Sequence, residues 1–144
     1  MGQIRTFLES IRTRVEAVVD GSAATVFSRV WIAPFINLDQ MVHIARWPAA
    51  IIVDKGGQYD AYNGKIMLRQ FSVSIMDCHP RDHVGEETSL QILDKGEYLV
   101  TTLEYDSDNS VFNASDDDLE AIALESGLLI LLKTYNFTAQ YLRT

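Results

Sequence analysis

The stretch Trp47-Pro48-Ala49-Ala50-Ile51-Ile52-Val53-Asp54-Lys55-Gly56-Gly57 divides this chain into a helical beginning and a strand-rich remainder. The residue before a proline is pushed toward extended geometry, so Trp47 is a natural turning point. The apolar run from Ala49 to Asp54 predicts a strand. The Gly56-Gly57 pair predicts the end of that strand and the start of a loop from Lys55 to Lys65, which contains a second turn signal at Tyr62-Asn63-Gly64-Lys65.

The sequence before this stretch begins with the pattern of an amphipathic helix. Between Gln3 and Val19 the apolar residues recur at steps of three and four, and Asp20-Gly21 is a suitable helix end. A shorter helix is predicted from Leu38 to about Arg46, with Asn37 as its N-cap. The intervening segment, Ser22–Ile36, has no period that decides between helix and strand.

The sequence after the glycine pair alternates first with a period of two and then with a helical period. Arg69–Asp77 predicts a strand with one face toward the core and the other toward water or a neighbouring subunit. The core-facing residues are Phe71, Val73 and Ile75, and the residues on the other face include Ser72, Ser74 and Met76. A helix is predicted from about Thr88 to Tyr105. Because Gly96 falls on its apolar face, the helix backbone is expected to pack closely against the sheet.

The end of the chain predicts two further strands. Leu119–Leu124 and Leu129–Tyr141 would meet across a turn at Glu125-Ser126-Gly127, and the first half of the last strand is expected to be buried on both faces. An alternative makes Asp116–Leu132 a helix with Ser115 as its cap. The elements together predict an α+β fold in one domain, residues 1–144, in which a mostly antiparallel sheet is covered by the N-terminal helix and a central helix.

Composition limits the classes of function. Twelve basic and twenty acidic residues give a net charge of −8, which disfavours sequence-specific binding to nucleic acid. Several acids are concentrated in one stretch, which favours a solvated loop: Asp106, Asp108, Asp116, Asp117, Asp118 and Glu120. Cys78 is the only cysteine, so a disulfide within one subunit is excluded. No apolar run approaches the ~20 residues of a membrane span, and the N-terminus has no secretory h-region, so we expect a cytoplasmic protein.

One segment has the residue types of a metal or catalytic site. Asp77-Cys78-His79-Pro80-Arg81-Asp82-His83 contains two imidazoles and two carboxylates, which could hold zinc or iron. Pro80 opposes a helix that would put both histidines on one face, so a polar turn is favoured over a metal site. The chain has no nucleophile elbow and no phosphate-binding loop. We therefore expect a protein that is not an enzyme, with no catalytic residues, metal or cofactor.

A cluster of large rings has two interpretations. Trp31, Phe35 and Trp47 could form an aromatic patch that faces a partner, or they could pack in the core. The pattern favours the core without excluding the partner.

The order of these elements resembles the tail-terminator, or tail-completion, proteins of tailed bacteriophages. The features that carry the resemblance are the N-terminal helix, the strand Pro48–Val53 running into Gly56-Gly57, the alternating strand, the helix containing Lys95–Leu103, and the terminal strands. The resemblance implies a homohexameric ring that caps the tail tube, stops its polymerisation and provides a docking surface for neck or head-completion proteins. Such a protein would be assembled in the host cytoplasm, would reside in the virion tail or neck, and would need no membrane.

Two sets of residues are candidates for this role. Loops on a rigid sheet commonly carry contacts, so the expected interface residues are Gly56, Gly57, Tyr59, Arg81 and Asp82. Asp116, Asp117 and Asp118 are candidate channel-lining acids, past which DNA would slide without sequence-specific binding. The alternatives are a head-completion or neck connector protein, a small metal-dependent enzyme using His79 and His83, and an unrelated small binding domain.

Overall fold

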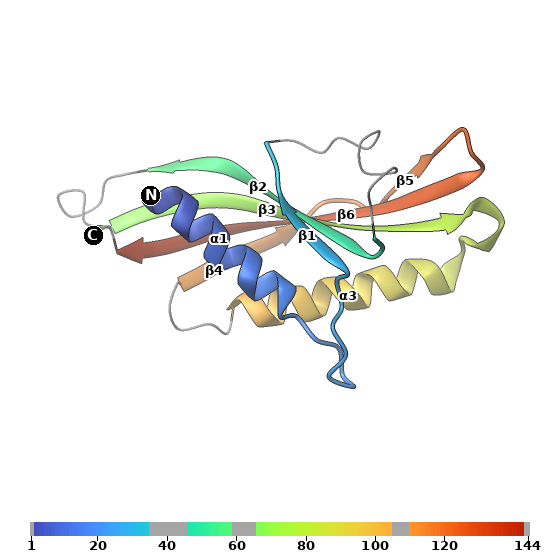
Figure 1. The fold of residues 1–144 in the computed structure, drawn as a ribbon, viewed down its shortest axis with the longest axis horizontal. Coiled ribbons are helices and arrows are strands. Elements are labelled where there is room, and N and C mark those ends of the chain that lie inside the picture. The colour runs from blue at the N-terminus through green and yellow to red at the C-terminus, as the bar shows by residue number, and fades with distance from the viewer. Residues whose placement is uncertain (1, 35–45, 59–65, 105–109, 143–144) are drawn as a thin grey trace.

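The structure is a computed structural model that describes residues 2–34, 46–58, 66–104 and 110–142. The predicted α+β class is confirmed, because two helices lie on one face of a mostly antiparallel six-stranded sheet (Figure 1). The described elements, in chain order, are α1 Gln3–Glu16, β1 Arg29–Ile32, β2 Ala49–Gln58, β3 Ile66–Pro80, the short 3-10 helix η1 Arg81–His83, α3 Glu86–Glu104, β4 Ser110–Asp116, β5 Glu120–Ala123 and β6 Leu128–Leu142.

The centre of the sheet is the pair formed by β3 and β6. These two strands pair antiparallel over their whole length, from Ile66 opposite Leu142 to Pro80 opposite Leu128. Fifteen residues each make this ribbon about 50 Å long. The strand order is β1-β2-β3-β6-β4, and β5 pairs with β6 beyond the end of β4. Among the strands that the structure describes, β1 and β2 are the one parallel pair. The two edges of the sheet are therefore β1 on one side and β4 with β5 on the other.

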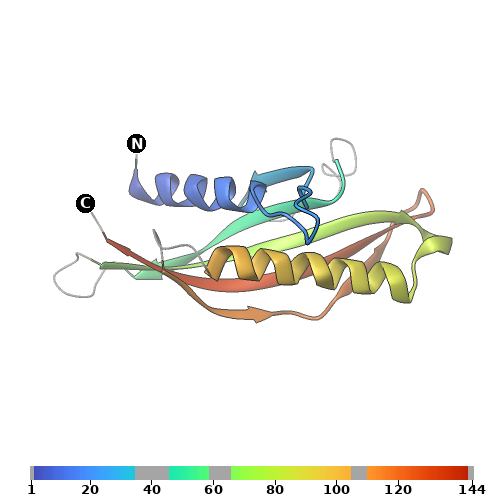
Figure 2. The same cartoon turned by 90° about the horizontal axis from the view of Figure 1, so that it is seen from below.

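Both helices bury their apolar stripes on the same face of the sheet. Figures 1 and 2 show α1 and α3 next to each other along it. Phe7 of α1 meets Phe71 edge-on at 5.8 Å between ring centroids, and Phe71 stacks on Phe137 at 5.3 Å. The predicted core positions Phe71, Val73 and Ile75 are confirmed. No helix in the described ranges is long and apolar enough to cross a membrane.

The opposite face of the sheet has an apolar cluster of its own. It consists of Ala49, Ile51, Val53, Met76, Ile130 and Leu132. The prediction that the first half of the last strand is buried on both faces is thereby confirmed.

The expectation that Ser72 and Ser74 face water or a partner is wrong, because the two serines are only 2% and 1% exposed. Met76 on the same face is also fully buried. β3 is a central strand, so larger neighbours enclose its small side chains. Ser74 lies in register between Ile51 and Thr134, and its hydroxyl is 2.8 Å from the Thr134 hydroxyl.

The Gly56-Gly57 pair does not end its strand, which corrects the sequence prediction. β2 continues to Gln58, and a bulge between Asp54 and Gly56 shifts the register. Gly56 adopts φ 93°, which a glycine accepts readily. A Cβ atom on Gly57 would lie 2.2 Å from the Leu68 carbonyl oxygen, so the second glycine permits close approach of β3.

The two-strand prediction for the end of the chain is confirmed, and the helical alternative for Asp116–Leu132 is excluded. β5 and β6 are joined by a turn at residues 124–127, as predicted. Part of the acidic stretch expected as a loop forms β4, because Val111 and Ala114 pack on the core, with a register shift between Phe112 and Ser115. The unassigned Ser22–Ile36 segment contributes β1. The predicted Leu38–Arg46 helix, apart from Arg46, and the turn at residues 62–65 lie outside the described residues.

Candidate functional site

The histidine cluster predicted from sequence is not assembled into a metal site. β3 continues through Pro80, which leaves His79 half-buried on the strand and His83 exposed on η1. His79 Nε2 is 3.4 Å from the Asp77 carboxylate, and Lys95 Nζ lies 3.9 Å from the same oxygen. Among the residues that the structure describes, no three His, Cys, Asp or Glu side chains are placed to hold a metal ion.

Cys78 lies on the opposite face of the sheet from Asp77 and His79, because successive strand residues point to opposite faces. It packs beside the second apolar cluster, and burial raises the pKa of its thiol, with a further contribution from the charge of Asp77. A thiol with a raised pKa is a weak nucleophile at neutral pH.

The expected interface residues do not form one surface. Gly56 and Gly57 pair with Gln70 and Arg69 near the beginning of β3, whereas Arg81 and Asp82 follow its other end. Eleven to twelve strand residues place these two positions on the order of 35–40 Å apart. Arg81 and Asp82 are exposed, and Tyr59 lies outside the described residues. One contact with a compact partner could not engage both groups.

Two of the three large aromatic residues, for which the sequence favours core packing over a partner-facing patch, pack against the sheet. Trp31 and Trp47 are half-buried and pack against the second apolar cluster. Phe35 lies outside the described residues. Arg29 places its guanidinium 4.6 Å from the centroid of the Trp31 ring, a cation–π contact on edge strand β1.

The acidic residues Asp116, Asp117 and Asp118 lie at the opposite edge, where β4 ends. Lys133 of β6, only 6% exposed, reaches the Asp116 carboxylate at 2.7 Å and the Asp117 carbonyl oxygen at 2.5 Å. A hydrogen bond and the positive charge of Lys133 lower the pKa of Asp116. Asn136 donates to the Asp117 carboxylate at 3.1 Å. Two of the three acids thus have partners within the chain.

Lys133 is the residue that sequence reasoning missed. It interrupts the apolar run Leu128–Leu132 at a position that points to the helix-covered face, in register with Ile75. A buried ammonium group needs an anionic or carbonyl partner. The sequence does contain a signal for this ion pair. Lys133 lies within a strand that is predicted to be buried, and the acidic stretch of the chain could supply its partner.

A cavity of ≈ 350 Å³ lies between α3 and β4, next to this ion pair. It is lined by Glu97, Asp116 and Tyr135 together with apolar residues of both elements. Burial, aided by the charges of Asp116 and Glu97, raises the pKa of Tyr135 to about 12. The Tyr135 phenol is therefore neutral at physiological pH and cannot act there as a phenolate.

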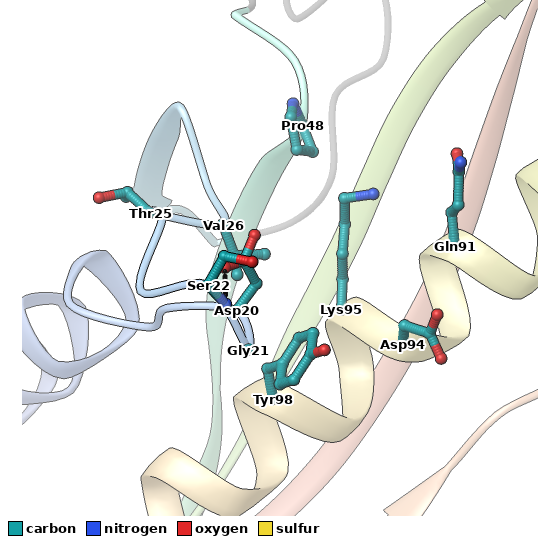
Figure 3. Close-up of a pocket in the computed structure, with 10 residues that line it drawn as sticks. All are labelled: Asp20, Gly21, Ser22, Thr25, Val26, Pro48, Gln91, Asp94, Lys95 and Tyr98. Carbon is teal, nitrogen blue, oxygen red and sulfur yellow. Dashed lines mark hydrogen bonds between the residues drawn. The ribbon is translucent and has the colours of Figure 1, made fainter.

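A larger cavity of ≈ 530 Å³ lies between the turn after α1 and α3. Figure 3 shows Asp20, Gly21 and Ser22 on one side, with Lys95 and Tyr98 projecting from α3 on the other. The Asp20 carboxylate accepts from the Ser22 and Ala24 amides at 2.8 and 3.0 Å. Asp20 therefore stabilises its own turn, and the cavity offers a polar recess without a base–nucleophile pair among the described residues.

The two edges of the described sheet are further candidate surfaces. No described strand pairs with β1 on its outer side or with β4 and β5 on theirs. An unpaired edge has free N–H and C=O groups that can accept another strand. No protein-family model matches this chain, and comparison with curated proteins finds no match.

Proposed function

We propose that this chain is a structural subunit of a phage or phage-derived tail. In this role it assembles into a ring, the hexamer that the resemblance implies, on the end of the tail tube. The ring stops tube polymerisation and offers a docking surface to neck or head-completion proteins.

The observation that carries the proposal is the order and pairing of the elements. The N-terminal helix, the strand after Pro48, the long strand, the Gly96 helix and the terminal strands occur in the order of the tail-terminator resemblance. The strands pair into one sheet with the long β3–β6 pair at its centre. The two outer edges of this sheet are formed by different strands, β1 on one side and β4 with β5 on the other. A ring subunit requires two different contact surfaces, one for each neighbour, and two dissimilar edges satisfy that requirement.

The proposal is tested by deleting the coding sequence from the particle that uses it and viewing the products by electron microscopy. We expect tube structures of uncontrolled length that are not joined to heads, because the end of the tube is left open to further subunits. Supplying the protein from a plasmid should restore tails of uniform length.

Two outcomes would contradict the proposal. Tails of normal length joined to heads would reject a capping role altogether. Tails of normal length that fail to join heads would favour the head-completion or neck connector role instead.

A further inference from the structure

Resting on the proposed function, we infer that copies of this chain associate head to tail through their sheet edges. The edge formed by β1 in one copy meets the edge formed by β4 and β5 in the next. The argument comes from the distribution of charge across the sheet and from the unpaired strands at its borders.

Charge is unevenly distributed along the sequence. Residues 1–69 contain eight basic and six acidic side chains, whereas residues 70–144 contain four basic and fourteen acidic ones. The fold converts this into a separation in space. α1, β1 and β2 come from the first part and lie at one side of the sheet, while α3, β4 and β5 come from the second part and lie at or toward the other. The two edges are four strand spacings apart, about 19 Å.

The β1 edge is basic and carries a preordered cation. Arg29 is exposed, and its contact with the half-buried Trp31 ring restricts the side chain before any partner arrives. The hydroxyl of Ser28 donates to the Trp47 carbonyl, which brings the exposed Arg46 to the same end of the edge. The Ser28 amide donates inward to Pro48. The Ala33 amide, just after β1, also donates inward, to the Ile52 carbonyl. Because alternate strand residues direct their backbone groups to opposite sides, those of Val30 and Ile32 point outward.

The β4–β5 edge is acidic. Asp117 and Asp118 are exposed between the two strands, and Glu120 is exposed at the start of β5. The Asp117 carboxylate is held by Asn136, which fixes part of the anionic surface in place. Asp116 is matched by Lys133 within the chain, so the adjoining carboxylates supply the charge available to a neighbour.

This distribution selects the geometry of association. Pairing an acidic edge with its own copy would bring carboxylates together, and pairing two basic edges would bring arginines together; both arrangements are repulsive. Joining unlike edges is attractive, and it leaves one free edge of each kind at the ends. Such heterologous contacts continue until the rotation between neighbours closes a ring. This assigns the acids to the contact between subunits and not to the channel wall.

The inference is tested by reversing charge on each edge separately. One variant combines Arg29→Glu with Arg46→Glu, and the other combines Asp118→Lys with Glu120→Lys. All four side chains are exposed, so both variants should fold, which circular dichroism and thermal unfolding will check. The control for the acidic-edge variant combines Glu86→Lys with Glu104→Lys, which makes the same charge change at exposed positions on α3.

We expect light scattering to find association of the native chain and of the control. Each edge variant alone should associate at least about tenfold more weakly, because like charges then meet. An equimolar mixture of the two edge variants should regain association, since the reversed edges complement each other as well as the native ones do. Association should also weaken toward about 1 M salt, where charges are screened beyond about 3 Å.

Three results would overturn the inference: a native chain that stays monomeric up to its solubility limit, edge variants that associate as the native chain does, or a mixture that fails to regain association. The capping function is judged separately, by tail length in the deletion experiment. A monomeric chain whose loss still gives overlong tails would reject edge pairing and retain capping. Edge-dependent association of a chain whose loss leaves tail length unchanged would retain edge pairing and reject capping.

Discussion

Gly96 of α3 lies directly against Tyr135 of β6. A Cβ atom at position 96 would be 1.7 Å from the Tyr135 hydroxyl oxygen and 2.2 Å from Cζ, so the helix backbone rests on the phenol ring. This contact fixes the distance between α3 and the sheet, and it confirms the close packing expected from a glycine on an apolar helix face.

Replacing Gly96 with alanine should therefore destabilise the protein. We expect Gly96→Ala to lower the free energy of unfolding by about 1–3 kcal/mol from overpacking, even though alanine favours a helix by about 1 kcal/mol relative to glycine. Urea denaturation measures the change. Gly21→Ala is the control, because a Cβ there meets only the Tyr98 hydroxyl at 3.7 Å. A Gly96→Ala protein as stable as the native one would contradict the contact.

The two glycines of the β2 bulge should differ in their response to alanine. Gly57→Ala should cost about 2–3 kcal/mol, because the new methyl group would meet the Leu68 carbonyl in the backbone of β3. Gly56→Ala should cost about 1–2 kcal/mol, since only its positive φ opposes a side chain and the surrounding space is open. Equal losses, or a larger loss at Gly56, would show that Gly57 does not approach β3 this closely.

Stability at high pH should depend on Tyr135. A tyrosine in the unfolded chain has a pKa of about 10, whereas burial in the folded protein raises the pKa of Tyr135 to about 12. Between those values the unfolded state has lost a proton that the native state retains, so the free energy of unfolding falls as pH rises. Tyr135→Phe should flatten this fall. Denaturation measured across that pH range, with Tyr98→Phe as control, tests the assignment.

Removing Asp116 from its ion pair with Lys133 should destabilise the protein more than removing Lys133. Asp116→Asn leaves a buried ammonium group without its carboxylate, whereas Lys133→Met replaces the cation with an apolar group of similar length. We expect the asparagine variant to be the less stable of the two by thermal unfolding. The reverse order would show that Lys133 is satisfied by the Asp117 carbonyl alone.

The same pair predicts a dependence on acid. Because Lys133 lowers the pKa of Asp116, its contribution is present above the ordinary carboxyl pKa and is lost as pH falls through the lowered native value. Lys133→Met should reduce the loss of stability on acidification. A variant with an unchanged acid profile would assign the loss to other carboxylates.

Much of the fold could be predicted from sequence where the periodicity was long. α1, β3, α3 and β6 each have an apolar pattern of nine residues or more, and the alternation correctly assigns Phe71, Val73 and Ile75 to the core. Shorter signals failed for a physical reason. β1 has only four residues, too few to show a period. β4 was predicted as a loop because acidic residues flank it on both sides.

The candidate surfaces were harder to predict than the core. The Gly56-Gly57 pair has the composition of a turn, yet β3 pairs with it and turns it into a bulge. Pro80 correctly predicts that His79 and His83 do not share a helix face, because His79 lies in β3 and His83 in η1. The separation of Arg81 from Gly57, and the partners of Asp116 and Asp117, depend on strand pairing between residues distant in the chain.

By itself, the sequence determined the α+β class, the two amphipathic helices, the long strands and the need for a glycine on the inner face of α3. Each of these follows from local spacing, because side-chain direction repeats with the period of the element. Only the tertiary structure decided which strands occupy the edges, and so placed the basic and acidic parts of the chain on opposite sides. Strand order arises from contacts between distant segments, and no local pattern of residues encodes it.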